Sequence, residues 1–556
     1  MNSTDPAAEM NGAEHLIDAL KNEGVEIVFS LSGNQIMPVY DALLGSGMRL
    51  IHTRHEGGAV YMAEAYAQAT GKVGIALLTA GPGFANGLSA MYSARESQTP
   101  LVVMTGDAPL KLAGRGAFQE MDQQTAAGAM AKASFSVDRA ADMFDAIRNA
   151  IALAQDGTPG PIHISLHDDV LRDVADRAAS NAPVPGITEL PSAHLQHLQL
   201  GQPVLDKIKA AKRPLVLAGP SFARAPWEEK FQALAAATGI PMLALESPRG
   251  LRAPRIGALA EVMPEVDLVV LLSIGPNFML GFGQAPAFDA TTQFVCCNNN
   301  QDVLSEAAHR LGGDQVTTVA LSGEHALTLL GADDPSSSGL QSNAAEAGWK
   351  SQVEEAIAWR PSAWQDIGAE APPFHAACVA AEVGKFLDKN PETSLIIDGG
   401  EVGQWCQAVL DAPCAIINGP SGAIGGSIPY AIAAKSARPD HPAIAMLGDG
   451  TAGFYFVEFE TALREQLPII AIVGNDAKWN AEHQIQVRDY GAQRAFGCEM
   501  VPTRYDEMAK AMGCYGENVT DIHELVPAIE RAIASGKPAC INVPLQSIAA
   551  PAISRK

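Results

Sequence analysis

Two acidic residues follow two predicted buried strands in the C-terminal third of the chain. Asp449 stands in Gly448-Asp449-Gly450 after the apolar run Ala443–Leu447, and Asp476 follows the run Ile469–Val473, 27 positions later. The carboxyl ends of parallel strands meet at one edge of a sheet, where α/β folds bind ligands. Two carboxylates, completed by a carbonyl and by phosphate oxygens, form a hard-oxygen site that suits Mg²⁺. Gly-Asp-Gly alone is also a common turn, and it is the pairing of the two strand ends that favours a metal site.

A third acidic residue, Glu56, lies in Arg54-His55-Glu56-Gly57-Gly58, directly before the helical pattern Ala59–Ala67. Taken alone, a glutamate at a helix start usually compensates the helix dipole at the surface. The motif that surrounds it indicates another role.

Both segments resemble those of thiamine diphosphate (ThDP) enzymes of the acetohydroxyacid synthase, pyruvate oxidase and benzaldehyde lyase superfamily. Gly448–Asn480 resembles the ThDP-binding motif, and Arg54–Ala67 is similar to its R-H-E run. The resemblance implies that Asp449, Asp476 and the carbonyl of Lys478 bind Mg²⁺, and that Gly448, Gly450 and Thr451 contact the diphosphate. Many relatives have Asn in place of Asp476, and the extra charge here implies tighter metal binding.

The same resemblance gives Glu56 a catalytic role. Its carboxylate is expected to hydrogen-bond N1′ of the aminopyrimidine, which favours the tautomer that removes the proton from thiazolium C2. The protein then supplies orientation while the cofactor supplies the electron sink. Because the family brings this glutamate and the Gly-Asp-Gly strand together from different subunits, we expect a homodimer or homotetramer with active sites between subunits.

Three further motifs extend the resemblance over the whole chain: Leu78–Asn86, Gly114–Asp122 and Gly422–Gly425. They imply that Gln119 is a catalytic polar group near the reacting carbonyl and that Phe118 is its apolar neighbour. Ile424 is expected to wedge under the cofactor and bend it into a V. Simple core packing is the alternative for Ile424 and for Phe118. Gly399 and Gly400 are expected at the diphosphate end of the cofactor.

The substrate pocket is expected to include Asn34, Gln35, Phe118 and Trp479, with His483 as the best candidate for proton transfer. Asn34 and Gln35 stand where relatives keep Gly, Pro, Ala or His, so no single relative's specificity can be transferred. His163 alternates with apolar residues in a strand and is predicted to be structural.

The elements that must position these residues are short, nearly continuous apolar runs alternating with helical segments, as in a parallel sheet covered on both faces. The predicted strands are Glu26–Phe29, Gly74–Thr79, Leu101–Thr105, Ile162–Leu166, Leu215–Ala218, Asp267–Ser273, Phe294–Cys297, Ser394–Asp398, Ala443–Leu447, Ile469–Val473 and Cys540–Pro544. Gly157–Leu166 resembles Gly536–Leu545. We therefore expect an α/β protein with three doubly wound parallel-sheet domains, of which the first and third are related. Polar linkers predict bounds of 1–185 for the N-terminal pyrimidine-binding domain, 190–340 for the central domain and 350–556 for the C-terminal diphosphate-binding domain.

The central domain of several relatives binds FAD or ADP. Asn298 in Phe294–Gln301 stands where an Asp commonly contacts ribose, and this departure argues against a bound nucleotide.

The composition excludes several classes of partner. With 556 residues, 47% hydrophobic and 18% charged, the chain reads as a globular protein. The net charge of −24 argues against nucleic acid or an anionic membrane as a partner. No run of 18 apolar residues and no signal peptide is recognisable. The eight Cys begin at Cys296 and include no CxxC pair, so we expect reduced thiols in a cytoplasmic enzyme that acts on a small molecule.

The leading expectation is a lyase or carboligase acting on 2-keto acids or 2-hydroxy carbonyl compounds, with acetolactate-synthase-like chemistry. The alternatives are 2-hydroxyacyl-CoA lyase-like, oxalyl-CoA decarboxylase-like or benzaldehyde-lyase-like activity, and, outside the enzymes, a non-catalytic homologue. The short stretch after the last predicted strand favours a substrate other than CoA esters.

Overall fold

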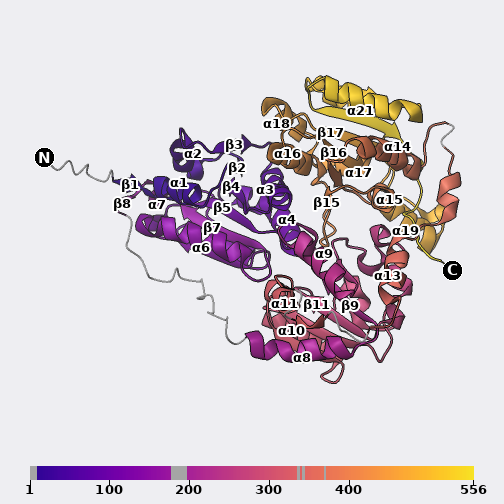
Figure 1. Cartoon of the computed structure of the whole chain (residues 1–556). Coiled ribbons are helices and arrows are strands. Elements are labelled where there is room, and N and C mark those ends of the chain that lie inside the picture. Colours follow the sequence, from indigo (N-terminus) through magenta and orange to yellow (C-terminus); the bar gives the residue numbers. More distant parts are fainter. Residues whose placement is uncertain (1–8, 177–196, 335–337, 341–344, 369–370, 556) are drawn as a thin grey trace. The chain divides into compact units, whose positions relative to one another are not determined.

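The computed structural model describes residues 9–176, 197–334, 338–340, 345–368 and 371–555. Three parallel sheets with covering helices make up this part of the chain, as the sequence predicts (Figure 1).

The N-terminal sheet has the strand order β3-β2-β4-β5-β7-β6. Its strands are β2 (Ile27–Ser30), β3 (Arg49–His52), β4 (Gly74–Leu78), β5 (Leu101–Asp107), β6 (Ala133–Val137) and β7 (Pro161–His167). Its main helices are α1 (Gly12–Asn22), α2 (Met37–Leu43), α3 (Glu56–Thr70), α4 (Pro82–Glu96), α5 (Gln123–Gly128), α6 (Met143–Gln155) and α7 (Asp168–Arg172). A small antiparallel pair, β1 (Met10–Asn11) and β8 (Val174–Ala175), lies beside it.

Helices cover both faces of this sheet. Leu16 of α1 and Ile147 of α6 share a buried cluster with Val102 of β5. On the opposite face, the ring of Phe84 in α4 packs 5.0 Å from that of His163 in β7. Figure 1 shows α1 and α6 on one side of the strands and α3 and α4 on the other. The strands are therefore shielded from water on both faces, which explains their continuous apolar sequence.

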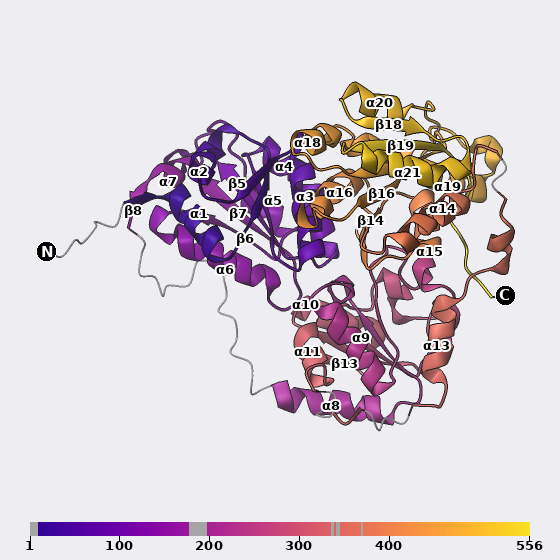
Figure 2. The ribbon, with the colours of Figure 1, turned by 45° about the horizontal axis from the view of Figure 1, so that its top comes forward.

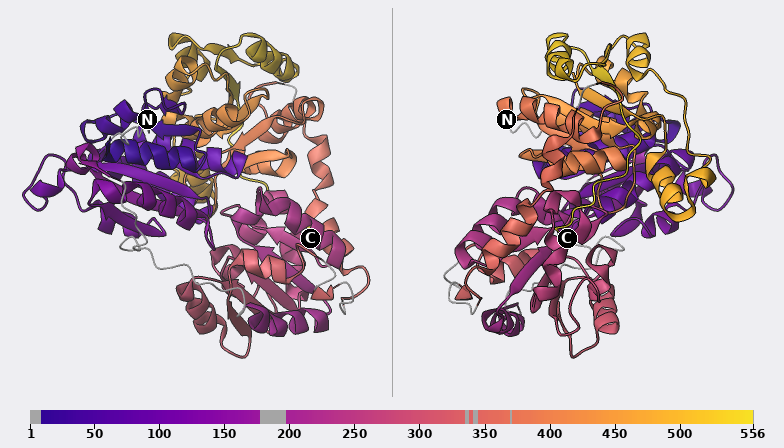
Figure 3. Two further views of the ribbon diagram at one scale, coloured as in Figure 1. Left: turned by 60° about the vertical axis from the view of Figure 1, so that its left-hand side comes forward. Right: turned by 90° about the vertical axis from the view of Figure 1, so that its right-hand side faces the viewer.

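The middle sheet has the order β10-β9-β11-β12-β13. Its strands are β9 (Pro214–Ala218), β10 (Met242–Ala244), β11 (Leu268–Leu272), β12 (Gln293–Asn298) and β13 (Val316–Ala320). Its helices are α8 (His197–Ala210), α9 (Trp227–Thr238), α10 (Gln301–Leu311) and α11 (Gly323–Leu329), and α13 (Trp349–Ala358) follows. Figure 3 shows from two further sides how helices flank these strands, drawn in magenta to salmon.

The C-terminal sheet has the order β15-β14-β16-β17-β19-β18. Its strands are β14 (Ser394–Ile397), β15 (Cys414–Ile417), β16 (Ala443–Gly448), β17 (Ile470–Asn475), β18 (Tyr515–Asn518) and β19 (Ala539–Pro544). Its helices are α14 (Ala376–Lys389), α15 (Glu401–Val409), α16 (Ser427–Ala437), α17 (Asp449–Tyr455), α18 (Glu458–Arg464), α19 (Asn480–Tyr490), α20 (Tyr505–Ala511) and α21 (Leu525–Ala534). Residues of α14, α15 and α21 form one buried cluster with the strands, on a face seen in Figure 2.

The N-terminal and C-terminal sheets share one topology. If the strands of each sheet are renumbered in chain order, starting from β2 and from β14, both sheets read 2-1-3-4-6-5. The two segments that resemble each other in sequence contain β7 and β19, which occupy the same place in this order. The predicted relationship between the first and third domains is confirmed.

The described chain divides into two compact units: residues 1–67 with 72–191, and residues 68–71 with 192–556. The middle and C-terminal sheets thus belong to one unit. The predicted domain bounds remain predictions, and the first of them, between 185 and 190, lies outside the described residues. All eight cysteines are free, as expected. No helix among the described residues has the length and apolar character that a membrane crossing requires.

Candidate active site

A cavity of about 90 Å³ lies at the carboxyl edge of the C-terminal sheet. Four loops contribute to it: the one that follows β14, the one that precedes α16, and the two at the carboxyl ends of β16 and β17. Its lining brings together most of the cofactor and metal residues that the sequence predicts for this unit, namely Gly400, Ile424, Gly448, Asp449, Gly450, Thr451, Asp476 and Lys478, and with them Trp479, which the sequence predicts for the substrate pocket. Glu401, Val402, Asn480, Ala481 and Glu482 complete it.

Two carboxylates in this cavity interact directly. Asp449 is 3% exposed and begins α17, while Asp476 follows β17, the neighbouring strand. Burial raises the pKa of Asp449 to about 6. Burial, together with the charge of Asp449, raises the pKa of Asp476 to about 7. Each acid therefore sits in an environment that disfavours its ionised form.

The donor set fits a hard divalent cation. Oδ2 of Asp449 is buried and has no hydrogen-bond partner in the described chain. A cation between the two carboxylates would satisfy this oxygen and remove their repulsion. The described residues contain no cluster of three His, Cys, Asp or Glu side chains that could hold a metal. The remaining ligands would therefore be main-chain and phosphate oxygens.

Two glycines have no room for a side chain: Gly450, which lines the cavity, and Gly399, which precedes the lining residue Gly400. A Cβ on Gly450 would come within 2.8 Å of the Trp479 ring. Gly399 has a φ of +98°, and a Cβ there would lie 2.8 Å from Oγ1 of Thr451. Glycine at these positions lets the backbone pass close to Trp479 and Thr451, where a side chain would clash.

Asp398 holds the loop that carries Ile424. Its buried carboxylate accepts hydrogen bonds from the backbone N–H groups of Gly399 at 2.6 Å, Gly425 at 2.9 Å and Ser427 at 3.0 Å. The sequence placed Asp398 at a strand end without a role. Its three bonds fix Ile424, which lines the cavity, relative to the end of β14.

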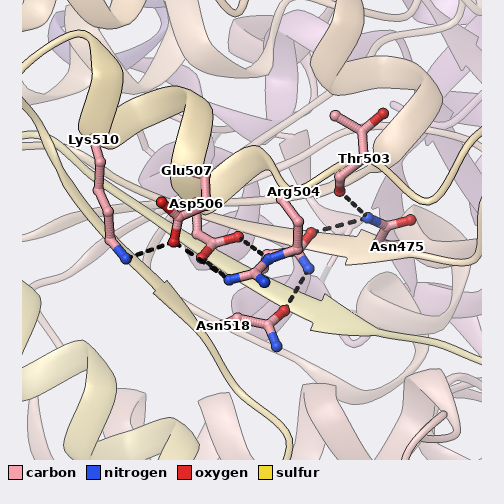
Figure 4. A network of polar contacts seen from close by, with 8 residues as sticks. Asn475, Thr503, Arg504, Asp506, Glu507, Lys510 and Asn518 are labelled. Carbon is pink, nitrogen blue, oxygen red and sulfur yellow. Dashed lines mark hydrogen bonds and ion pairs between the residues drawn. The ribbon is translucent and has the colours of Figure 1, made fainter.

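A chain of amides ties the end of β17 to the neighbouring strands. Nδ2 of Asn475 donates to Oδ1 of Asn542 at 3.0 Å, and Nδ2 of Asn542 donates to Oδ1 of Asn518 at 2.7 Å. Figure 4 shows this chain beside Arg504, which chelates the fully buried Asp506 at 2.8 and 2.6 Å. The residue directly before Asp476 is thus anchored to β19 and, through it, to β18.

Glu56 belongs to the other compact unit, where it is the first residue of α3 and 8% exposed. Asn86 of α4 donates from Nδ2 to Oε2 of Glu56 at 2.9 Å. A Cβ on Gly83 would lie 3.2 Å from the other carboxylate oxygen. Residues of α4 therefore hold the glutamate in place. The alternative interpretation, a dipole-compensating residue, would require it to lie on the surface, and it does not.

A second polar chain orients Gln119, whose φ of +62° is unusual for a residue with a side chain. Thr79 donates from Oγ1 to Oε1 of Gln35 at 3.0 Å, and Gln35 donates from Nε2 to Oε1 of Gln119 at 2.9 Å. In this arrangement the amide N–H groups of Gln119 remain available for another acceptor. Gln35 is buried, whereas Asn34 and Phe118 are exposed, the latter by 75%.

Three further predicted residues lie apart from these two constellations. His483 is half-buried on α19 and is not among the residues that line the cavity. His163 is fully buried, with Thr105 at 2.8 Å from Nε2 and Ser134 at 2.8 Å from Nδ1, so its structural role is confirmed. Asn298 uses its Oδ1 to accept from the N–H of Asn300 at 2.8 Å.

Two family models match the chain. The model described as "Thiamine pyrophosphate enzyme, N-terminal TPP binding domain" matches residues 10–126. The model described as "Thiamine pyrophosphate enzyme, C-terminal TPP binding domain" matches residues 398–543. The first range contains Glu56 and Gln119, and the second contains the cavity with its two carboxylates.

Curated relatives match over nearly the full length. A "Probable acetolactate synthase" of Mycobacterium bovis is 31% identical over 554 residues, covering 97% of this chain and 96% of the relative. A "2-hydroxyacyl-CoA lyase 2" of Homo sapiens is 27% identical over 598 residues, covering 98% and 91%. A "Probable acetolactate synthase large subunit" of Methanococcus aeolicus is 26% identical over 555 residues, covering 95% and 91%.

Proposed function

The chain belongs to the thiamine pyrophosphate enzymes, and on this premise we propose that it is a carbon–carbon lyase or carboligase acting on 2-keto acids or 2-hydroxy carbonyl compounds. Bound ThDP supplies a nucleophilic carbon and an electron sink for making or breaking a bond next to a carbonyl. The observation that carries the proposal is the pair of carboxylates that line the glycine-rich cavity: buried Asp449, with an unsatisfied oxygen, and half-buried Asp476.

In this proposal Asp449, Asp476 and the carbonyl of Lys478 bind Mg²⁺, and the metal carries the diphosphate. Gly399, Gly400, Gly448, Gly450 and Thr451 form the backbone wall around the phosphates. Ile424 supports the cofactor from below, and Asp398 positions its loop. The raised pKa values of both acids support the cation, because a divalent charge favours the ionised carboxylates that burial disfavours.

Glu56 accepts a hydrogen bond from the aminopyrimidine and so promotes proton removal from the cofactor. Asn86 supports this role, since its amide occupies one carboxylate oxygen and leaves the other for the ring. The glutamate need not bind the diphosphate, whose residues belong to the other compact unit. We propose that Glu56 and the metal residues come together from different subunits of a homodimer or homotetramer.

Gln119 donates an amide N–H to the substrate carbonyl oxygen. The chain from Thr79 through Gln35 supports this polarity, because it occupies the carbonyl oxygen of the Gln119 amide. Phe118, Asn34 and Trp479 are proposed as neighbours of the substrate, and His483 as a proton donor. Gln35 then acts by orienting Gln119, which refines its expected role as a residue that touches substrate.

Acetolactate-synthase-like condensation of two 2-keto acids, with release of one carboxylate as CO₂, is the leading reaction, and 2-hydroxyacyl-CoA cleavage is the second candidate. The names of the curated relatives support both. The test is a screen of the ThDP- and Mg²⁺-loaded protein against pyruvate, benzoin and 2-hydroxyacyl-CoA esters, with product analysis. Acetolactate from pyruvate is expected. Turnover of the CoA ester alone would favour the second reaction, and turnover of none would contradict the substrate class.

A further inference from the structure

Segment 498–505, which is irregular up to the first residue of α20, forms hydrogen bonds with the ends of the two strands that precede Asp449 and Asp476. Apart from one isolated bridge, residues 498–504 form no helix or strand, and residues 499, 501, 502 and 504 are exposed. Sequence reasoning assigned this segment no role.

Its first contacts are with the backbone that follows Asp476. The N–H of Trp479 donates to the carbonyl of Cys498 at 2.8 Å, and the N–H of Met500 donates to the carbonyl of Ala477 at 2.7 Å. Between them, Lys478 and Glu499 form an antiparallel bridge. Ala477 has a φ of +54°, a conformation that a residue with a side chain keeps only when its surroundings hold it there.

Its later contacts reach both strand ends. Asn475 donates from Nδ2 to the carbonyl of Thr503 at 2.7 Å. The hydroxyl of Tyr505, a buried residue, donates to the carbonyl of Asp449 at 2.9 Å. The chelation of Asp506 by Arg504 fixes the end of the segment on α20 (Figure 4). One segment therefore bonds to Asp449 itself and to residues on both sides of Asp476.

We infer that segment 498–505 is a clamp that sets the distance and angle between Asp449 and Asp476. Its positioning residue is Tyr505, and Asn475 is the positioning residue on β17 that bonds to it. The inference rests on the proposed role of the two carboxylates as Mg²⁺ ligands. The geometry matters because Mg²⁺ requires near-ideal octahedral coordination, whereas Ca²⁺ accepts flexible sites. Groups that orient metal ligands typically change metal affinity 10–100-fold when removed.

The test is Tyr505→Phe, which removes only the hydroxyl that holds the Asp449 carbonyl. Its matched control is Tyr515→Phe, because Tyr515 donates its hydroxyl to Glu517 at 2.5 Å on β18, in the same unit but away from the cavity. ThDP affinity is measured by calorimetry with Mg²⁺ and again with Ca²⁺, and the melting temperature of the metal-free proteins checks the fold. Tyr505→Phe is expected to weaken Mg²⁺-supported binding about 10-fold. It should weaken Ca²⁺-supported binding less than about threefold, because Ca²⁺ tolerates the looser site. Tyr515→Phe should match wild type with both metals.

Equal weakening with both metals, or none, would overturn the clamp. Should Tyr505→Phe not fold, Asn475→Ala applies the same measurement to the bond with Thr503, which it removes together with the contacts to Asn542 and Ala477. Its control is Asn390→Ala, which removes an amide that donates to the carbonyl of Phe386 at the end of α14. Asp449→Ala, measured in parallel, separates this inference from the proposed function. If Asp449→Ala abolishes binding while Tyr505→Phe behaves as wild type, only the clamp is wrong. If Asp449→Ala binds normally, the metal site is wrong and the clamp falls with it.

Discussion

Asn86 donates a 2.9 Å hydrogen bond to one carboxylate oxygen of Glu56, while Gly83 leaves the other oxygen without a crowding side chain. Helix α4 thus determines which face of the Glu56 carboxylate is available to a ligand. This arrangement supports a glutamate that acts on the aminopyrimidine and contributes little to holding the phosphates.

Replacing Glu56 by Gln should therefore separate activation from binding. The amide keeps the shape of the side chain but loses the carboxylate, so turnover should fall roughly 10²–10⁴-fold. ThDP affinity should change little, and deuterium exchange at thiazolium C2 should slow in parallel with turnover. Glu96→Gln, in the last turn of α4, is the matched control. Wild-type exchange and turnover in Glu56→Gln would return Glu56 to the role of a helix-start residue.

Asp449→Asn should lower the affinity for ThDP, while the metal-free protein should be at least as stable as wild type. The variant removes a buried charge that repels Asp476, so its metal-free form should melt at the same temperature as wild type or higher. ThDP affinity at fixed Mg²⁺ should fall more than about 100-fold, beyond the usual effect of a merely supporting residue. Melting curves with and without ThDP and Mg²⁺ measure both effects. A variant that the cofactor stabilises as it does wild type would contradict the assignment.

The central domain is expected to bind no flavin. The side-chain oxygen of Asn298, at the end of β12, already accepts from the backbone of Asn300, and the side chain is 3% exposed. It therefore offers ribose neither a charge nor an uncommitted acceptor. The visible spectrum of the purified protein tests this expectation, and stoichiometric absorbance of an oxidised flavin would show it to be wrong.

His163 should make the protein less stable in acid. Burial lowers its pKa from 6.5 to about 3, so the unfolded chain takes up a proton below pH 6.5 that the folded chain refuses. The contribution of neutral His163 to the free energy of unfolding is fully present above pH 6.5. It falls by about 1.4 kcal/mol per pH unit toward pH 3, which amounts to a loss of about 2 kcal/mol at pH 5. Melting temperatures between pH 7 and 5 should decline more steeply for wild type than for His163→Gln. Parallel curves would show that His163 titrates normally.

The sequence identified every strand in the interior of the three large sheets and no complete edge strand. The eleven predicted strands correspond to β2, β4, β5, β7, β9, β11, β12, β14, β16, β17 and β19. The edge strands β3, β6, β10, β13, β15 and β18 carry more exposed residues, as the alternation in Val316–Ala320 shows. A continuous run of apolar residues indicates a strand that is buried on both faces. An edge strand has a neighbouring strand on one side only, so more of its residues are exposed and the run is interrupted.

The motif residues of the candidate site could be predicted, but the residues that orient them could not. Asp449, Asp476 and Glu56 stand in short segments with recognisable neighbours. Asn86 and Tyr505 each act through one contact, 30 and 56 positions away, and Asp398 acts through two distant contacts, 27 and 29 positions away. Such pairs depend on how strands and helices pack, and no local spacing encodes them.

The shared strand order also makes the carboxyl edges of the two sheets comparable position by position. Both sheets read 2-1-3-4-6-5, so the strand ends of one have equivalents in the other. In the C-terminal sheet the third and fourth strands are followed by Asp449 and Asp476. In the N-terminal sheet the third strand is followed by Thr79 and the fourth ends at Asp107. Equivalent strand ends thus carry a carboxylate in one sheet and, in the other, the hydroxyl that starts the chain to Gln119. One strand order presents two different sets of side chains at its edge.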